Sequence, residues 1–436
     1  MSARHQLKVL PEDAVAIPSL QCSPSEVAKQ WPSGIPLFAL IANGEHDSWS
    51  RWSILARADG PSFVSNSNSI FEDMDSLFKE KSNATLLPNW IGYLSYECGH
   101  VAEPVIGEKP EQDWSLAHLV WCDSALIFDH LQNEWWSIGG CEVPDACMEN
   151  AISCECSELL EVEDDDTYKD AVQQTIDYIH RGDIFQANIT RRFTASIHGN
   201  IRHAALDMLE APGGWFGAWL EFPDTNKYLL SMSPELFLTT HQQTRTVLTR
   251  PMKGTRPEHA SPDELLDSDK DAAELHMIVD LMRNDLGRLC EFGSIQVESA
   301  RALERHPTVW QCVGEVSGTL RSDVSATDVI RGTFPAGSVT GAPKVRAMEI
   351  INQLESSPRG PYCGAIGVFG QSLHLNVAIR TAMIQGEGNA CNLHGNLTYS
   401  TGCGIVADSI PEDEVQESRV KVAIMDQFTT PVTTHS

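Results

Sequence analysis

The run IFQANITRRF, residues 184–193, most constrains the fold, because apolar and polar residues alternate along it. Three apolar residues alternate with three polar ones, Phe185, Ala187 and Ile189 with Gln186, Asn188 and Thr190. Successive side chains of a β-strand point to opposite faces of its sheet. We therefore predict a strand with one buried apolar face and one polar face that can line a site.

A second run, LNVAIRTAM at residues 375–383, has the same character. Val377 and Ile379 would point one way, and Asn376, Ala378 and Arg380 the other. Two strands of a rigid sheet would thus offer polar groups to one site.

The charge balance excludes some partners. The 436 residues include 31 Lys and Arg against 60 Asp and Glu, which gives a net charge of -29. Nucleic acid and anionic membranes would repel such a chain, so we expect neither as a partner. An anionic ligand would need a local reversal of the field, made by a few cations, helix N-termini or a divalent metal.

The sequence also bears on the cellular compartment. No apolar run approaches the roughly 18 residues that cross a bilayer, and the start at Met1 lacks the apolar stretch of a secretory signal. We therefore expect a cytoplasmic protein. The twelve cysteines are scattered, and the pair Cys154 and Cys156 has no second pair at metal-ligand spacing, so free thiols are expected.

The length favours two or three domains, or one elaborate unit. Residues 1–153 consist of short strand-like segments and turns that are rich in Trp. The acidic stretch CECSELLEVEDDD at 154–166 is the predicted connection. Residues 167–430 hold most of the motifs, and residues 431–436 form a tail.

One predicted helix, within DKDAAELHMIVDLMRNDLGRL at 269–289, carries a pair of carboxylates. Its apolar stripe consists of Leu275, Ile278, Met282, Leu286 and Leu289. Asp271 and Glu274 lie three residues apart and therefore share a helix face. Such a pair is either a solvated face or a source of metal ligands.

A second predicted helix lies in SIPEDEVQESRVKVAIMDQF at 409–428. Ser409 and Glu412 have the spacing of a capping box at its start. Glu414, Glu417 and Lys421 then project from one side. Two acidic pairs on two helices would suit Mg²⁺, which takes one or two carboxylates and leaves positions for substrate oxygens, although surface helices also carry such pairs.

Two glycine-containing turns could approach an anion. In AGSVTGAPKVRAMEII at 336–351, Thr340 is the predicted N-cap of a helix whose free N–H groups would suit a carboxylate or phosphate, or which is simply capped. In TGCGIV at 401–406, Gly402 and Gly404 let the backbone approach a ligand or make a tight turn. Cys403 between them lacks the strand, elbow and partner His of a nucleophile, so that role is discounted.

In their order along residues 165–428, the motifs resemble those of the chorismate-utilising enzymes, a family that includes anthranilate, aminodeoxychorismate, isochorismate and salicylate synthases. The stretches that carry the resemblance are GDIFQANITRRF, SPELF, RPMKGTRP, DKDAAELHMIVDLMRNDLGR, GTFPAGSVTGAPKVRAMEII, YCGAIG, NVAIRT, TGCGIVADS and EVQESRVK. GYLSYE at 92–97 extends it weakly into the N-terminal part.

The resemblance implies an α+β fold of two facing, mainly antiparallel sheets with helices outside. It implies Mg²⁺ held by Glu274 and Glu417, with Asp271 and Glu414 supporting the ion. The groups that would hold the two carboxylates of chorismate are Arg380, Lys421, Tyr362, Ser338 and the backbone near Gly341, Gly402 and Gly404. The Trp-rich N-terminal region resembles the part in which relatives bind tryptophan.

The lysine of RPMKGT, Lys253, would be a solvated charge on its own. Within the family, a lysine here resembles the aminodeoxychorismate synthases, where it is proposed to attack ring carbon 2. An attacking amine must be neutral, and Glu235 in SPELF is placed to protonate the departing hydroxyl. Members that add water have a lysine base where this chain has Gln186, and Gln cannot abstract a proton.

Other features bear on product and partners. Members that release pyruvate usually have a histidine where this chain has Gln311, so retention of the enolpyruvyl group is expected. No glutaminase motif is present, so a separate glutamine amidotransferase subunit would supply ammonia. Anthranilate synthase component I and a non-catalytic chorismate-binding paralogue remain the alternatives.

Overall fold

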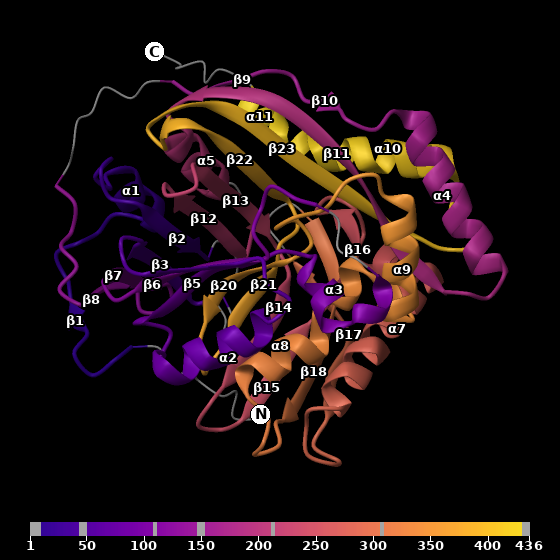
Figure 1. Cartoon of the computed structure of the whole chain (residues 1–436), viewed down its shortest axis with the longest axis horizontal. Helices are drawn as coiled ribbons and strands as arrows, with labels where there is room; N and C mark the ends of the chain where they lie inside the picture. Colours follow the sequence, from indigo (N-terminus) through magenta and orange to yellow (C-terminus); the bar gives the residue numbers. More distant parts are fainter. Residues whose placement is uncertain are drawn as a thin grey trace.

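The computed structural model describes residues 10–42, 50–107, 111–145, 153–210, 214–305 and 309–429 (Figure 1). The predicted tail at 431–436 and the start at Met1 lie outside these residues. Two large antiparallel sheets dominate the molecule, and helices lie outside them. The predicted α+β class with two antiparallel sheets is therefore confirmed.

The first sheet draws its strands from both the N-terminal and the C-terminal parts of the chain. Its order is β1 (Val15–Ala16), β8 (Glu134–Ile138), β7 (Ala125–Asp129), β3 (Trp52–Arg57), β2 (Leu37–Ile41), β12 (Phe216–Phe222), β13 (Lys227–Ser233), β22 (Thr381–Asn389), β23 (Asn392–Ile405), β11 (Gln186–Gly199) and β10 (Leu160–Glu161). Two further strands, β9 (Glu155–Cys156) and β19 (Gly341–Ala342), pair with β11. The acidic stretch 154–166 thus lies partly along β11 as two short strands.

The second sheet is built in the same mixed way. Its order is β16 (Met252–Pro257), β18 (Val309–Thr319), β15 (Thr246–Arg250), β14 (Leu236–His241), β21 (His374–Val377), β20 (Ala365–Phe369), β5 (Asn89–Leu94), β6 (Ala117–Cys122) and β4 (Ser62–Ser65). Strand β17 (Gln296–Arg305) pairs with β18. Residues 1–153 therefore contribute strands to both sheets.

The helices cover the outer faces (Figure 1). They are α1 (Pro24–Lys29), α2 (Ile70–Glu80), α3 (Cys98–Ala102), α4 (Asp165–His180), α5 (Ile201–Glu210), α6 (Asp263–Leu266), α7 (Asp269–Gly287), α8 (Ala326–Thr333), α9 (Lys344–Leu354), α10 (Pro411–Val422) and α11 (Asp426–Thr429), with 3₁₀ turns η1 (Pro104–Ile106), η2 (Gly337–Val339) and η3 (Ala423–Met425). Helix α10 packs on α4 and β23, whereas α7 packs on β17 and β18. Within the described part of the chain, no helix combines the length and the apolar character that crossing a membrane requires.

The inner faces of the two sheets share one hydrophobic core. Ile54 and Leu229 of the first sheet and Ile91 and Leu375 of the second belong to the same buried cluster. This cluster also takes in the predicted apolar stripe of α7, which is buried at every position. The first turns of α7 contact β16, so Asp271 and Glu274 in these turns lie against the cations of that strand.

The predicted strand at 184–193 is largely confirmed. Ala187 and Ile189 are fully buried, as the alternation requires. The prediction for Phe185 was wrong, since 72% of this residue is exposed. Strand β11 begins one residue later, at Gln186, so Phe185 stands outside the alternating ladder.

A buried ion pair joins the N-terminal region to the middle of the first sheet. The Arg202 guanidinium donates to both carboxylate oxygens of Glu221 at 2.6 and 2.8 Å. Glu221 also accepts hydrogen bonds from the Leu37 amide and the Trp219 indole, and Arg202 donates to the Trp31 carbonyl. Both side chains are at least 95% buried, so water cannot solvate the charge that remains if its partner is removed.

We expect Glu221→Ala to lower the free energy of unfolding by about 3 to 5 kcal/mol, because it leaves the Arg202 charge buried without its counter-ion. Urea unfolding followed by circular dichroism measures this change. Asp280→Ala is the matched control, because it breaks the exposed Arg283–Asp280 pair and should cost no more than about 1 kcal/mol. Equal losses for the two variants would contradict the assignment.

Candidate active site

One large cavity, of about 760 Å³, collects most of the predicted site residues. The predicted residues that line it are Glu235, Lys253, Asp271, Glu274, Ser338, Tyr362, Arg380, Gly402, Gly404, Glu414, Glu417 and Lys421. They come from both sheets and from α7 and α10, so residues almost 190 positions apart in the sequence meet in one space. The volume suits a small organic ligand.

A bulge in β16 carries Lys253 towards α7. The pairing with β18 shifts its register between Lys253 and Thr255, and Gly254 between them has φ of +78°. A Cβ at Gly254 would lie 3.0 Å from the Asp271 carboxyl carbon, so glycine is needed both for this conformation and for this approach. Lys253 Nζ then lies 3.2 Å from Glu274 Oε2.

The second carboxylate of α7 is paired in the same way. Arg256, three residues after Lys253, places its Nη2 2.9 Å from Asp271 Oδ2. Both carboxylates of α7 therefore face cations of β16 across the cavity wall. Sequence spacing predicts this carboxylate pair, whereas the only sequence signal for Arg256 is its place in RPMKGTRP.

Helix α10 supplies the other two carboxylates. Glu414 is 94% buried and accepts a hydrogen bond from Ser409 Oγ at 2.7 Å. The predicted capping box at Ser409 was therefore wrong, because its hydroxyl binds Glu414 rather than the helix N-terminus. Glu417 pairs with Lys421 at 2.7 Å, and Lys421 Nζ also donates to the Gly402 carbonyl at 2.7 Å.

The floor of the cavity is the pair β11 and β23, in which Asn188 lies opposite Gly404. A Cβ at Gly404 would lie 2.6 Å from Gln186 Nε2 and 2.7 Å from Lys253 Nζ. A Cβ at Gly402 would lie 2.7 Å from Asn188 Nδ2. A side chain at either glycine would therefore displace the polar groups that lie over it.

Two predicted residues do not line the cavity. Gln186 is 99% buried, and its amide and the Lys253 amine both lie over Gly404. Gln186 is therefore part of the wall of the site but is not exposed to the cavity. Gly341 pairs with Ala187 through β19, and a Cβ there would lie 2.1 Å from the Gln186 carbonyl oxygen. Thr340 is not a helix cap, because α9 begins at Lys344 and the Thr340 hydroxyl donates to the Ala336 carbonyl.

Glu235 is a buried carboxyl group beside Lys253. Burial raises the pKa of Glu235 to about 7, an effect that the Ser338 hydrogen bond and the Lys253 charge partly oppose. Ser338 Oγ donates to Glu235 Oε1 at 2.6 Å. A carboxyl group with this pKa carries its proton for much of the time near neutral pH, which a general acid requires.

Arg380 is the cation that is best placed for an anion. Its φ is +50°, and its carbonyl accepts the Met232 amide at 3.0 Å, which fixes the backbone where β22 begins. Burial lowers the pKa of its guanidinium. Among the residues that the structure describes, no carboxylate pairs with this guanidinium, so its donors face the cavity for a ligand.

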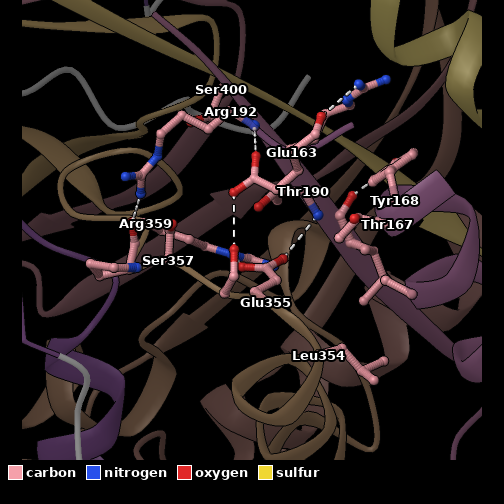
Figure 2. Close-up of a pocket in the computed structure, with 15 residues that line it drawn as sticks. Glu163, Thr167, Tyr168, Thr190, Arg192, Leu354, Glu355, Ser357, Arg359 and Ser400 are labelled. Carbon is pink, nitrogen blue, oxygen red and sulfur yellow. Dashed lines mark hydrogen bonds and ion pairs between the residues drawn. The ribbon is translucent and has the colours of Figure 1, made fainter. Parts of the chain in front are cut away.

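Arg359 joins two walls of the cavity, and no pattern in the sequence predicts this role. Its guanidinium donates to the carbonyls of Val339 and Asn188 at 2.8 and 2.6 Å, and both of these residues line the cavity. Glu355 accepts two further bonds from it. Figure 2 shows Arg359 and Glu355 in a smaller adjoining pocket, which shares Ser400 with the main cavity.

The donor set suits Mg²⁺. Four carboxylates, two on α7 and two on α10, line one cavity, and hard oxygen donors are the ligands that Mg²⁺ prefers. Cys403 behind them is not a nucleophile, because burial raises the pKa of its thiol to about 12. The thiol of Cys403 instead donates a weak hydrogen bond to the Glu414 carbonyl.

A layered α+β fold around a carboxylate-lined cavity defines a class of small-molecule enzyme, and comparison identifies the family. The profile of the chorismate binding enzyme family matches residues 43–427, and the chain belongs to this family. The solved anthranilate synthase component I of Streptococcus pneumoniae superposes with a TM-score of 0.75 at 25% identity, over 87% of this chain and 92% of that one.

Sequence relatives divide between two activities. The chain is 40% identical over 265 residues to anthranilate synthase component 1 1 of Haloarcula marismortui, which covers 58% of this chain and 51% of the relative. It is 39% identical over 264 residues to aminodeoxychorismate synthase component 1 of Escherichia coli, which covers 58% and 56%. The matches thus span about half the length of these relatives, and identity does not distinguish the two reactions.

The raised pKa of Glu235 predicts a pH dependence of stability. The unfolded chain loses the Glu235 proton above the ordinary pKa of 4.5, whereas the folded protein keeps it up to about pH 7. The stabilisation that comes from this proton is therefore fully present below pH 4.5 and is lost as the pH rises to about 7. We expect the free energy of unfolding of Glu235→Gln to rise relative to that of the wild type by up to about 3 kcal/mol between these pH values. Urea unfolding from pH 4.5 to pH 8 measures the difference.

Glu412→Gln, at an exposed position of α10, is the control and should follow the wild type throughout. Curves for Glu235→Gln and the wild type that stay parallel over this range would show that Glu235 titrates normally.

Proposed function

We propose that this chain is the large component of an aminodeoxychorismate synthase, which converts chorismate and ammonia to 4-amino-4-deoxychorismate. The observation that carries the proposal is Lys253, whose amine lies inside the cavity, beside the buried acid Glu235 and within 3.2 Å of Glu274. The resemblance supports the assignment, since lysine at this position is typical of that activity and alanine of anthranilate synthases.

Chorismate would be held by its two carboxylates. Arg380 can form a bidentate pair with one of them, and Tyr362 and the backbone near Gly402 and Gly404 complete that side of the cavity. The carboxylates of α7 and α10 line the same cavity. Bound Mg²⁺ would neutralise the second substrate carboxylate there, held by Glu274 and Glu417 with support from Asp271 and Glu414.

Lys253 would act as the nucleophile. A divalent cation held by Glu274 would weaken the attraction of this carboxylate for the Lys253 ammonium, and so would favour the neutral amine that the attack requires. The neutral amine would attack ring carbon 2, both ring double bonds would shift, and the 4-hydroxyl would depart. Ammonia would then add at carbon 4, both double bonds would shift back, and the Lys253 amine would leave carbon 2, which restores the enzyme.

Glu235 would supply the proton for the departing hydroxyl. Its carboxyl group has a pKa near 7 and is aligned by Ser338, so it can donate the proton and recover one in the second step. Gln186, beside Lys253, cannot act as a base, which disfavours addition of water. Gln311 lines the cavity where pyruvate-releasing relatives have histidine, which favours retention of the enolpyruvyl group.

The ammonia would come from a glutamine amidotransferase subunit, since both curated relatives are named as a component 1. The product would serve synthesis of 4-aminobenzoate and folate in the cytoplasm. A tryptophan ligand in the N-terminal region remains a prediction. The main alternative is anthranilate synthase component I, supported by the similar identity to that relative, and a non-catalytic chorismate-binding paralogue is the second.

Lys253→Ala should reduce formation of aminodeoxychorismate by at least about a thousandfold, because it removes the amine that forms the covalent intermediate. Purified protein is incubated with chorismate, Mg²⁺ and ammonium, with and without 4-amino-4-deoxychorismate lyase, and the products are identified by mass spectrometry. The wild type should yield 4-aminobenzoate only with the lyase. Anthranilate formed without the lyase would support the alternative, and no turnover would support the paralogue.

Glu274→Gln and Glu417→Gln should each weaken Mg²⁺ binding in the presence of chorismate by about tenfold or more, because each removes a charged ligand. Isothermal titration of Mg²⁺ into the chorismate complex measures this affinity directly. Glu412→Gln, on the exposed side of α10, is the matched control. Unchanged Mg²⁺ affinity in both site variants would refute the metal assignment.

A further inference from the structure

We propose that Cys403, Glu414 and Glu417 form a binding site for a thiophilic divalent cation, such as Zn²⁺ or Co²⁺, that overlaps the magnesium position. One donor atom of each residue, the Cys403 sulfur and a carboxylate oxygen of each glutamate, lies within 4.8 Å of the other two. The proposed function does not use the Cys403 thiol, and Mg²⁺ would gain nothing from a sulfur ligand.

The fold brings these three donors together for a specific reason. Gly402 and Gly404 face the cavity, so Cys403 between them points to the other face of β23, towards α10. Helix α10 presents Glu414 and Glu417 one turn apart above that face, and both also line the cavity. The Cys403 sulfur therefore lies beside two carboxylates that also line the cavity.

A cation already lies at this place. The ammonium of Lys421 is 2.7 Å from Glu417 Oε1, 2.7 Å from the Gly402 carbonyl oxygen and 4.0 Å from Cys403 Sγ. The Gly402 oxygen, which is not one of the three proposed ligands, thus also points at a positive charge. Because 43% of the Lys421 side chain is exposed, it can leave for solvent when a metal ion takes its position.

The geometry requires only a small closing of the site. Zn²⁺ bonds of about 2.0 to 2.3 Å place tetrahedral ligands roughly 3.5 Å apart, so the donors have to approach by about 1 Å. The fourth ligand would be water from the cavity. The Cys403 thiol gives up its proton to the buffer as sulfur binds, so one thiolate and two carboxylates hold the ion.

Occupation of this site has a consequence for the proposed activity. It takes Glu417 away from Mg²⁺ and displaces Lys421 from the cavity wall, so Zn²⁺ should inhibit in competition with Mg²⁺. The binding itself does not depend on chorismate chemistry. A failure of the proposed function would therefore leave the metal site standing, and the two can be distinguished.

The test is titration of the full chain with Co²⁺ alone, followed by near-ultraviolet absorption. Thiolate bound to Co²⁺ gives a sulfur-to-cobalt charge-transfer band, which we expect in the wild type and not in Cys403→Ala. Cys122→Ala removes another fully buried thiol and should keep the band. No band in the wild type, a band that survives in Cys403→Ala, or one lost in Cys122→Ala would each overturn the proposal.

Two further variants keep the test decisive if Cys403→Ala does not fold. Glu417→Gln, at a position whose side chain is 53% exposed, should weaken Co²⁺ binding by about tenfold or more. Lys421→Met removes the competing ammonium and should strengthen Co²⁺ binding by several-fold. Unchanged affinity in both variants would contradict the proposed ligands.

Discussion

The salt bridge between Lys253 and Glu274 is the interaction on which the account of this site depends. It joins a bulged strand of the second sheet to a helix whose apolar stripe is fixed in the core, and so sets where an amine and a carboxylate meet. A chain with a net charge of -29 repels anions over most of its surface. Inside the cavity the balance differs, because Lys253, Arg256, Arg380 and Lys421 all line it.

Within the described part of the chain, three of these cations pair with carboxylates, whereas Arg380 does not. Lys253, Arg256 and Lys421 each pair with a carboxylate that is also a proposed metal ligand or its support. Binding of a divalent ion to those carboxylates would therefore make the positive charges of Arg256 and Lys421 available to a bound dianion and would favour the neutral form of the Lys253 amine. The same exchange explains why a metal with affinity for sulfur could take the position of the Lys421 ammonium near Cys403.

The parts of this site that lie on regular elements could be predicted from sequence periodicity, whereas Glu235, Tyr362 and Arg380 lie on connections between elements. The alternation around Ala187 and Ile189 and the stripe that begins at Leu275 follow from the strand and helix periods alone. What failed were local expectations that tertiary contacts overrode. Ser409 binds Glu414 rather than capping α10, and Phe185 falls just outside the strand.

Other features had no local signal at all. Arg359 contacts the carbonyls of Asn188 and Val339, which lie 171 and 20 positions away in the sequence, so only the folded chain reveals its place. Residues 1–153 contribute strands to both sheets, and these strands pair with partners far away in the sequence, as β2 does with β12. Spacing along the sequence cannot encode such pairings, because they depend on which sheet edges meet.

Mass spectrometry of the intact protein, mixed with chorismate and Mg²⁺ in the absence of ammonia and quenched with acid, tests the central claim most directly. The account predicts a covalent adduct with the mass of chorismate less one water, and peptide mapping should place it on Lys253. An unmodified chain that still forms aminodeoxychorismate once ammonium is added, or an adduct on another residue, would contradict it.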